Sequence, residues 1–334
     1  MSRTTPPTSA EPRRTGGRVS RRRLVLALAA TGTLLAGTAA TSYAGEDTAT
    51  PAEQTSPFTG LPAEPAPVLA VKIDNASGAR PHTNVEDADM VYVEKVEGGM
   101  SRLIGIYSSQ LPDTIGPVRS AREYNAEQLQ TFDRPALAYS GAQKGVDEIL
   151  DKSPIFNLSN DNFPSAFRRA DDRPAPHNLY VDPQAILDEA GEASLSADIG
   201  LRFGDRPEGG EPTEERTVNY GTAEIGVKWS AEEERWLASF DGEPAMSTDG
   251  EQLGGKTVVV QKVDMPPSDF QDPTNTTPFI ETVGEGEATV LRDGEAFETT
   301  WKRDNEKDGT TYTLPNGEPM PFDPGQTWVV YEER

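Results

Sequence analysis

The sequence predicts a mixed α/β or α+β domain followed by a small all-β domain, a sandwich or a barrel. The first half of the chain alternates strand and helix patterns, whereas the second half is almost entirely strand and turn. Between them lies a polar stretch rich in Gly, Pro and charge, residues 204–216. Because 334 residues suffice for about two domains, we expect one domain at 57–203 and another at 217–332, with 204–216 as the linker.

Four short apolar runs predict buried strands in the first domain. They lie at residues 68–74, 90–96, 102–107 and 136–140, and the first of them also contains β-branched residues. Gly98 and Gly99, between the second and third runs, supply the positive φ that a hairpin turn needs. These two strands are therefore expected to pair as a hairpin.

Helical spacing of apolar residues predicts two helices in the same domain, and a helix-start signal predicts a third. The first begins at Ser120, which has capping-box spacing with Glu123, and extends to Phe132. The second covers residues 142–150. In the third, at 182–190, the order Asp-Pro gives an N-cap followed by a first-turn proline.

Five further runs predict strands in the second domain, at 257–263, 288–291, 296–302, 310–314 and 327–331. Asp-Gly and Asn-Gly pairs at 293–294, 308–309 and 316–317 are hairpin signals between several of them. All tryptophans of the chain lie in this half: Trp229, Trp236, Trp301 and Trp328. We expect their rings in the core, and an aromatic platform for carbohydrate is the alternative.

The first 44 residues have the pattern of an export signal. Seven arginines precede a mostly apolar stretch at 24–40, and the Ser-Arg-Arg-Arg-Leu sequence before it resembles a twin-arginine motif. Small residues at Ser42 and Ala44 predict cleavage after Ala44. An uncleaved membrane anchor and export by the Sec route are the alternatives. Residues 45–56 are expected to form a disordered tether.

Composition excludes several classes of site and partner. The chain has no cysteine, which excludes disulfides, thiolate metal sites, a cysteine nucleophile and a lipid-bearing cysteine. Of the 31 basic and 55 acidic residues, seven and one lie in the first 44, so the remainder has 24 basic and 54 acidic residues and a net charge of −30. Such a surface repels nucleic acid and anionic lipid. It serves solubility, or else forms an acidic surface for cations.

The most informative stretch is IGPVRSARE, at residues 115–123. Arg119 and Arg122 place positive charge where the dipole of the predicted helix is already positive, so something negative must neutralise them. Internal carboxylates such as Asp74 or Glu97 are one explanation. An anionic ligand held at the helix N-terminus is the other.

Other ionisable residues border the predicted strand ends. Asp74 ends the first strand, where ligands collect in α/β sheets, although Arg80 is close enough in sequence to pair with it. Glu94, Glu97 and Arg102 surround the Gly-Gly hairpin. Paired carboxylates there would perform general acid and base work, and carboxylates paired with Arg102 are the structural alternative.

A proline-bracketed loop presents the second of the two histidines. His177 and Asn178 follow a Pro-Ala-Pro sequence that fixes a rigid extended path, which suits their presentation to a site. The alternative is a His177 side chain buried against backbone. His82 and His177 lack the spacing of a helical metal pair, so we expect no metal. The chain has no GxSxG, Walker, GxGxxG or HExxH motif, and we expect no cofactor.

Several motifs occur in the order found in one bacterial protein family. They are PFTGLPAE, VKIDN, ARP, ADMVY, VEGGMSR, IGPVRSAR and APHNLY, followed by a weaker C-terminal pattern at residues 286–289, 300–302 and 324–328. Over residues 57–332 the chain thereby resembles the YerB-like lipoproteins, a family defined by a domain of unknown function. The resemblance implies an exported two-domain protein whose motif residues gather at one site: Asp74, Arg80, Glu97, Arg102, Arg119, Ser120, Arg122, His177 and Asn178.

Three departures from the family pattern limit what the resemblance implies. Family members usually have a lipid-bearing cysteine, so its absence here argues against a lipid anchor. His82 stands where a polar residue such as Gln is expected. Val93 rather than an acid follows Tyr92, and a shift of one residue would move Glu94 to the opposite face of its strand.

Three functions are compatible with these residues. In the first, a binding module of the cell envelope, Arg80 and the two arginines at the helix start hold an anionic group of a wall polymer or small molecule. In the second, an envelope hydrolase or transferase, Glu97 or Asp74 acts as acid or base with assistance from His177. In the third, a ligand-free scaffold, the protein's own side chains fill the cleft.

Overall fold

The computed structural model describes residues 54–271 and 275–334, all of which belong to one compact unit. The expected export signal, with its cleavage after Ala44, lies outside these residues. None of the helices found in the described ranges has the length and apolar character needed to cross a membrane. The fold begins before residue 57, because Ser56 is buried and its hydroxyl accepts a hydrogen bond from the Phe58 N–H at 3.2 Å.

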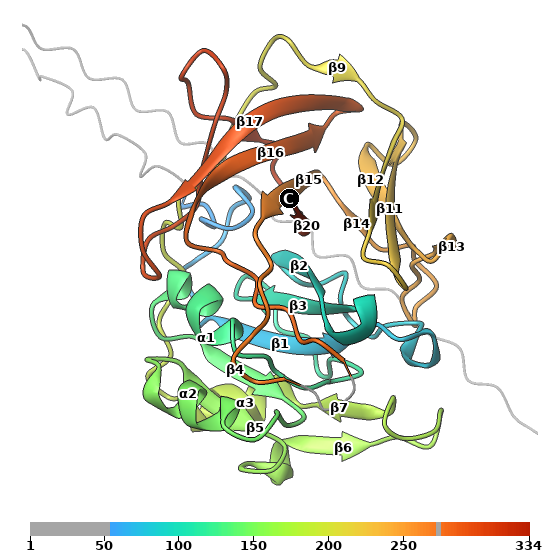
Figure 1. Ribbon diagram of the computed structural model, residues 1–334, viewed down its shortest axis with the longest axis vertical. Helices are drawn as coiled ribbons and strands as arrows, with labels where there is room; N and C mark the ends of the chain where they lie inside the picture. The colour runs from blue at the N-terminus through green and yellow to red at the C-terminus, as the bar shows by residue number, and fades with distance from the viewer. Residues whose placement is uncertain (1–53, 272–274) are drawn as a thin grey trace, which may run out of the picture. The chain divides into compact units, whose positions relative to one another are not determined.

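The strands predicted in the first half form one side of a large mixed sheet (Figure 1). β1 (Leu69–Asp74) pairs antiparallel with β3 (Ser101–Tyr107) and parallel with β4 (Ala136–Tyr139). β2 (Met90–Lys95) pairs with β3 through the expected hairpin, whose turn η2 (Glu97–Gly99) has positive φ at both glycines. β5 (Phe156–Ser159) lies parallel to β4 at the edge. The four strand predictions are confirmed.

The second half extends the same sheet. β20 (Thr327–Glu333) lies between β2 and β15 (Thr257–Val263) and is parallel to both. Beyond β15 follow β16 (Gly284–Arg292), β17 (Glu295–Arg303) and β18 (Thr311–Thr313). Residues Thr327 to Tyr331 are all buried, so this apolar strand needs a neighbour on each side. The two halves therefore share one sheet, and the described residues after 203 contain strands but no helix.

The stretch expected to be a linker takes part in this arrangement. β8 (Arg202–Phe203) pairs with β19 (Pro321–Phe322), and β9 (Glu211–Pro212) pairs with β17. The backbone on both sides of residues 204–210 is thus held by strands from the far end of the chain.

A smaller sheet, not predicted from the sequence, stands beside the large one (Figure 1). It consists of β10 (Glu215–Asn219), β11 (Glu224–Ser230), β12 (Arg235–Phe240), β13 (Glu243–Pro244) and β14 (Gly254–Gly255). The strands of the second half are thus divided between two sheets instead of closing as a sandwich or barrel. The rings of Trp236, Trp301 and Trp328 are at most 1% exposed, which supports a core role and leaves no platform on them.

The helices are short, and α1, α2 and α3 lie together at the lower left of Figure 1. They are α1 (Asn125–Gln128), continued by η3 (Leu129–Phe132), then α2 (Val146–Lys152) and α3 (Pro183–Glu189). α3 begins as predicted, with the Asp182 side chain accepting from the Ala185 N–H at 3.1 Å. Two further 3-10 turns, η1 (Ser77–Ala79) and η4 (Pro164–Ala166), occur in loops.

The predicted start of the first helix is wrong. The helix begins at Asn125, and the Ser120–Glu123 capping box does not form. The reason is that the preceding backbone pairs with β1, with the Arg119 N–H donating to the Lys72 carbonyl, while the Ala121 N–H donates to the Gly141 carbonyl in the loop after β4. Residues that pair with a strand in this way are extended and cannot also form a first helical turn.

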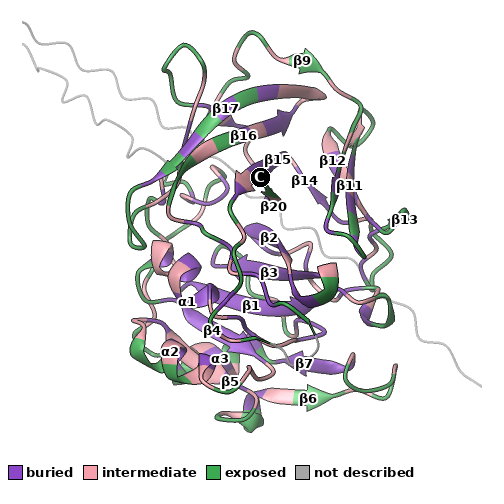
Figure 2. Ribbon diagram, in the orientation of Figure 1, coloured by how far each residue is buried: buried purple, intermediate pink, exposed green. Residues whose placement is uncertain are grey.

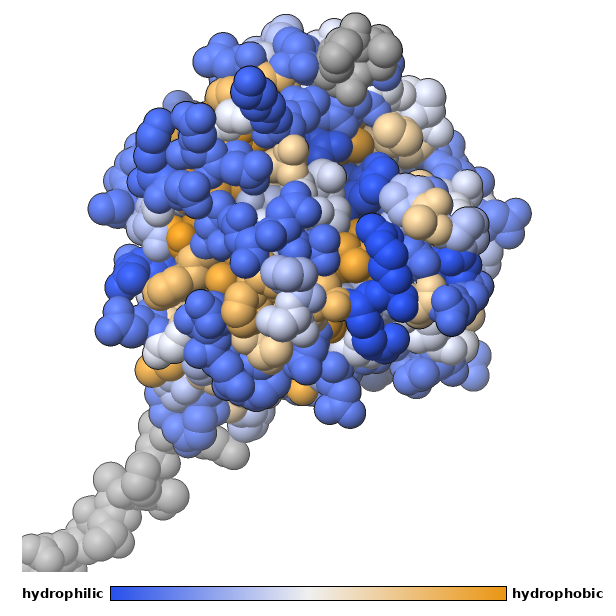
Figure 3. Space-filling view, turned by 90° about the horizontal axis from the view of Figure 1, so that it is seen from below, coloured by the Kyte–Doolittle hydropathy of each residue, from blue (hydrophilic) through white to orange (hydrophobic). Residues whose placement is uncertain are grey.

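The central strands β1, β2 and β3 of the large sheet are largely buried (Figure 2), and different elements cover its two faces. Val71 and Ile73 of β1 belong to a core cluster with Trp236 and Phe240 of the small sheet. The opposite face, with Ala70, packs under α1. Because successive residues of a strand point to opposite faces, every second residue of β1 lies on the α1 side. On the outside of the molecule, Figure 3 shows hydrophobic side chains near the middle of the lower face, among hydrophilic ones.

Candidate functional site

The face of the sheet under α1 becomes polar at one end. Lys72 and Asp74 of β1, Glu94 of β2 and Arg102 of β3 point to this side. Arg102 is directly opposite both carboxylates in the strand register, Asp74 on one neighbour and Glu94 on the other. All four side chains are at most 4% exposed. The shift of Glu94 relative to the family pattern has therefore not removed it from this group.

Lys72 and Glu94 form a closed internal pair. The ammonium contacts the Glu94 carboxylate directly, and the Tyr124 hydroxyl and the Asn125 amide each donate to the same carboxylate at 3.2 Å. Burial lowers the pKa of Lys72 to about 8, against the opposing effect of Glu94. Neither side chain is exposed, so the pair supports the fold and does not meet a ligand.

Asp74 is the centre of the cluster. Its Oδ2 lies 2.8 Å from His177 Nδ1 and 3.5 Å from Arg119 Nε, and its Oδ1 lies 3.4 Å from Arg102 Nε. The Ala76 N–H donates to Oδ1 at 3.1 Å. Burial alone would raise the pKa of this carboxyl, but Arg102, the Ala76 N–H, His177 and Arg119 together lower it below the ordinary value. Asp74 is therefore an ionised, acceptor-only group.

Arg122 is neutralised internally. Its Nε and Nη2 donate to the two Glu97 oxygens at 2.6 and 2.5 Å, and its Nη1 donates to the Ser120 and Ala121 carbonyls. Burial would raise the pKa of Glu97, but the bonds from Arg122 lower it. The prediction of a ligand held by Arg122 at a helix N-terminus is therefore wrong on two counts: the helix starts later, and an internal carboxylate already occupies the guanidinium.

Arg119 and His177 are the members of the cluster that reach the surface. Their side chains are 28% and 24% exposed, and each uses one nitrogen on Asp74 Oδ2. The terminal nitrogens of Arg119 and Nε2 of His177 make no hydrogen bond to any residue in the described ranges. The alternative of a His177 buried against backbone is wrong, because the ring binds a carboxylate and is partly exposed.

A glycine leaves room for the His177 ring. A Cβ placed on Gly78, in η1, would lie 3.1 Å from His177 Cδ2 and 3.5 Å from its Nε2. Such a contact is tighter than almost all Cβ contacts, so a larger residue here would displace the ring. The turn after β1 and the proline-bracketed loop thus fix the imidazole from two sides.

The cluster has more positive than negative charge. Lys72, Arg102, Arg119 and Arg122 face only three carboxylates, those of Asp74, Glu94 and Glu97. One positive charge is unbalanced, although the chain as a whole has a formal net charge of −24. This end of the sheet is therefore a place where an anion meets a locally favourable charge.

Three predicted site residues lie at the margin. Arg80 forms an ion pair with Asp241 at 2.8 Å instead of binding Asp74, and it borders an open groove of about 450 Å³. Ser120 contributes its carbonyl to Arg122. Asn178 accepts from Arg169 Nη1 at 2.8 Å and donates to a backbone carbonyl.

His82 is a buried structural residue. It is fully buried, its Nε2 lies 2.9 Å from the Asp74 carbonyl, and its ring packs edge-on against Phe240. Burial lowers the pKa of His82 to about 4. Within the described residues no group of three or more His, Asp and Glu side chains is arranged to hold a metal ion.

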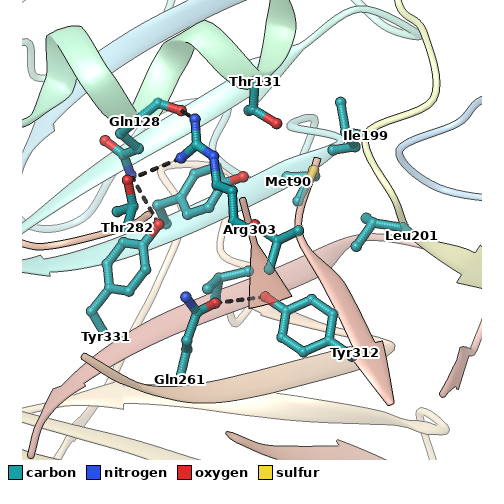
Figure 4. A pocket seen from close by; sticks show the side chains of 13 residues that line it. Met90, Gln128, Thr131, Ile199, Leu201, Gln261, Thr282, Arg303, Tyr312 and Tyr331 are labelled. Atoms are coloured by element: carbon teal, nitrogen blue, oxygen red, sulfur yellow. Dashed lines mark hydrogen bonds between the residues drawn. The ribbon is translucent and has the colours of Figure 1, made fainter. Parts of the chain in front are cut away.

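An enclosed cavity elsewhere in the molecule is too small for a ligand. It lies beside Arg303, between Gln128, Tyr312 and Tyr331, as Figure 4 shows. Its volume of about 20 Å³ has room for roughly one or two water molecules. Arg303 donates to neutral acceptors there, among them Thr282 Oγ1 at 2.9 Å. This cavity is therefore not a candidate ligand site.

Lys72 is a cluster member that the sequence analysis missed. It stands two residues before Asp74 on the same strand. The two-residue period of a strand places both side chains on one face, so this signal was available.

Comparisons with known proteins agree with the motif pattern. Residues 58–196 match the family described as "Protein of unknown function (DUF3048) N-terminal domain", and residues 216–329 match its C-terminal domain. The chain is 29% identical over 292 residues to "Putative lipoprotein YerB" of Bacillus subtilis (strain 168), across 82% of this chain and 85% of that protein. It is also similar to the crystal structure of the YerB protein from Bacillus subtilis, with a TM-score of 0.73 and 26% identity over 83% of this chain and 96% of that one.

Proposed function

The chain belongs to the DUF3048 family of proteins of unknown function, and from this premise we propose that it binds an anionic group at Arg119 and His177. We place this activity outside the cytoplasm. The first 44 residues have the pattern of an export signal, and the similar Bacillus subtilis protein bears a lipoprotein name. The absence of cysteine argues against a lipid anchor on this chain.

One observation carries the proposal: Arg119 and His177 both contact Asp74 Oδ2, and both keep nitrogens without a partner among the described residues. A guanidinium offers several N–H groups in a plane that matches the oxygens of phosphate or carboxylate. Protonated imidazole adds a donor at Nε2. Asp74 holds the two groups side by side, so little ordering is required when an anion arrives.

The position in the fold supports the same reading. β1 and β4 are parallel neighbours, and the cluster lies at the carboxyl end of β1, where ligands collect in sheets of this kind. The proposed site differs from the one expected at sequence level. It is formed at the end of β1 and by the proline-bracketed loop with His177, and it does not include the start of a helix.

Titration calorimetry of the full-length chain with phosphate and sulfate tests this proposal. We expect Arg119→Gln to weaken binding at least tenfold, about 1.4 kcal/mol. Arg134→Gln is the matched control, because Arg134 is an exposed arginine whose carboxylate partner lies 3.9 Å away, outside the cluster. Equal affinities for all three proteins, or no binding by the unmodified chain at millimolar anion, would contradict the proposal.

A second candidate function, an envelope hydrolase or transferase, is favoured by the 2.8 Å Asp74–His177 contact. A buried carboxylate that binds Nδ1 leaves Nε2 as the atom that exchanges a proton with substrate. In this function Asp74 is a positioning residue, since it is fully buried. Glu97 is unsuited to act as acid or base, because Arg122 binds both of its oxygens.

Product release from isolated cell-wall fragments tests the enzymatic candidate. If it holds, His177→Ala reduces the rate at least about a hundredfold, the usual worth of a general base. A rate that is unaffected by this substitution, or no release by the unmodified chain, rules it out and leaves the binding function alone.

A further inference from the structure

We propose that the site takes a ligand with two adjacent anionic groups, of which diphosphate is the simplest, and that Arg169 on β6 (Phe167–Arg169) holds the second group. This inference rests on the proposed function, in which Arg119 and His177 hold the first group. It adds the ligand class and one further binding residue.

The starting observation is how arginines are paired across the molecule. Nearly every arginine of the described ranges has a carboxylate within 4.0 Å, and the exceptions are Arg168, Arg169 and Arg303. Arg303 is buried, but Arg168 and Arg169 are exposed neighbours on β6. Acidic residues outnumber basic ones by 55 to 31 in this chain, so an exposed arginine without a carboxylate is unexpected.

Arg169 is held in place by a residue that the sequence analysis singled out. Its Nη1 donates to Asn178 Oδ1 at 2.8 Å, and Asn178 is the residue after His177. Asn178 is only 8% exposed, and its Nδ2 donates to the Ala170 carbonyl at 2.7 Å. Asn178 thus fixes the guanidinium of Arg169, whose Nε and Nη2 make no hydrogen bond to described residues.

Arg168 provides an internal comparison. Neighbouring residues of a strand point to opposite faces, and Arg168 lies over the Tyr180 ring at 5.5 Å and reaches Thr114 Oγ1 at 3.4 Å. Like Arg169 it is exposed and has no carboxylate within 4.0 Å, but it makes no hydrogen bond to Asn178. Substitution of Arg168 therefore measures the effect of losing one positive charge on β6, and substitution of Arg169 measures that effect together with any specific role of Arg169.

Overall charge decides between a short and a long ligand. A long polyanion would leave the small positive area and meet a surface with a large excess of carboxylates. At physiological ionic strength charges act over a Debye length of about 8 Å, so the favourable field is local. A ligand with two neighbouring phosphate-type groups uses both arginines and stays within this range.

Calorimetric titration of orthophosphate and pyrophosphate into the full-length chain, at equal ionic strength, tests the inference. We expect pyrophosphate to bind at least tenfold more tightly than orthophosphate. In Arg169→Gln this gain should disappear while orthophosphate still binds, and Asn178→Ala should reduce the gain. Arg168→Gln is the matched control and should keep it.

The outcomes separate the two proposals. If orthophosphate binds but pyrophosphate gains nothing, or the gain survives in Arg169→Gln, the two-anion inference is overturned and the site at Arg119 and His177 stands. A gain lost equally in Arg168→Gln also overturns it, because general charge then explains the effect. If neither anion binds, the proposed function itself fails.

Discussion

His177 Nδ1 and Asp74 Oδ2 lie 2.8 Å apart although 103 residues separate them in the chain. Asp74 is fully buried and His177 is 24% exposed on its side chain, so the contact joins the interior of the sheet to the surface. The ionised carboxylate of Asp74 fixes which imidazole nitrogen of His177 faces inward.

Asp74→Asn is expected to weaken the fold and strengthen anion binding. The substitution leaves Arg102 and Arg119 without their carboxylate, and loss of one partner of a buried ion pair costs about 3 kcal/mol. The Asn oxygen still accepts hydrogen bonds and can keep Arg119 and His177 side by side, so the excess of positive charge attracts an anion. Urea denaturation and phosphate titration measure the two effects, with exposed Asp113→Asn as the control. Weaker phosphate binding by the folded variant would argue against the charge balance described here.

Arg122→Lys is expected to affect stability and not binding. Lysine keeps the charge but cannot reproduce the paired N–H bonds to Glu97, so the free energy of unfolding should fall by about 1–2 kcal/mol. The phosphate affinity should stay within twofold. A large loss of affinity with unchanged stability would show that Arg122 touches the ligand after all.

His82 should make the protein less stable in mild acid. Its pKa is about 4 in the fold and 6.5 ordinarily, so the unfolded chain binds the extra proton and stability falls as the pH falls from about 6.5 to about 4. The full loss amounts to roughly 3 kcal/mol. His82→Gln, the residue expected from the family pattern, should remove this part of the slope in urea denaturation at several pH values. A constant difference between the two proteins over that range would refute the assignment.

Ser120→Ala should change the free energy of unfolding by less than about 0.5 kcal/mol, because Ser120 does not cap a helix. Asp182→Ala should cost about 1 kcal/mol, because Asp182 does cap α3. Thermal unfolding of both variants checks the pair. Equal losses would mean that the helix starts near Ser120 in solution.

Much of the fold was predictable where local pattern decides it. β15 matches its predicted range, β1 differs by one residue, and α3 begins at its Asp-Pro cap. The pairing of β20 with β2 was not predictable, because it joins strands more than two hundred residues apart. The first helix was misplaced for the same reason: the Arg119 N–H binds Lys72 of a distant strand.

The site was predictable in its residues more than in its geometry. The motif resemblance, now confirmed as family membership, named Asp74, Arg119 and His177, which the structure brings together. It could not separate Arg122, which is neutralised internally, from Arg119, which is not. Arg169 escaped notice because its place depends on the Asn178 side chain rather than on any sequence spacing.

Anion binding at Arg119 and His177 is tested most directly by a crystal of the protein soaked in selenate, with the anion located by its anomalous scattering. We predict a selenium peak whose oxygens lie about 3 Å from the Arg119 terminal nitrogens and from His177 Nε2. Selenate bound only at other surfaces, with the Arg119 nitrogens in contact with water alone, would contradict it.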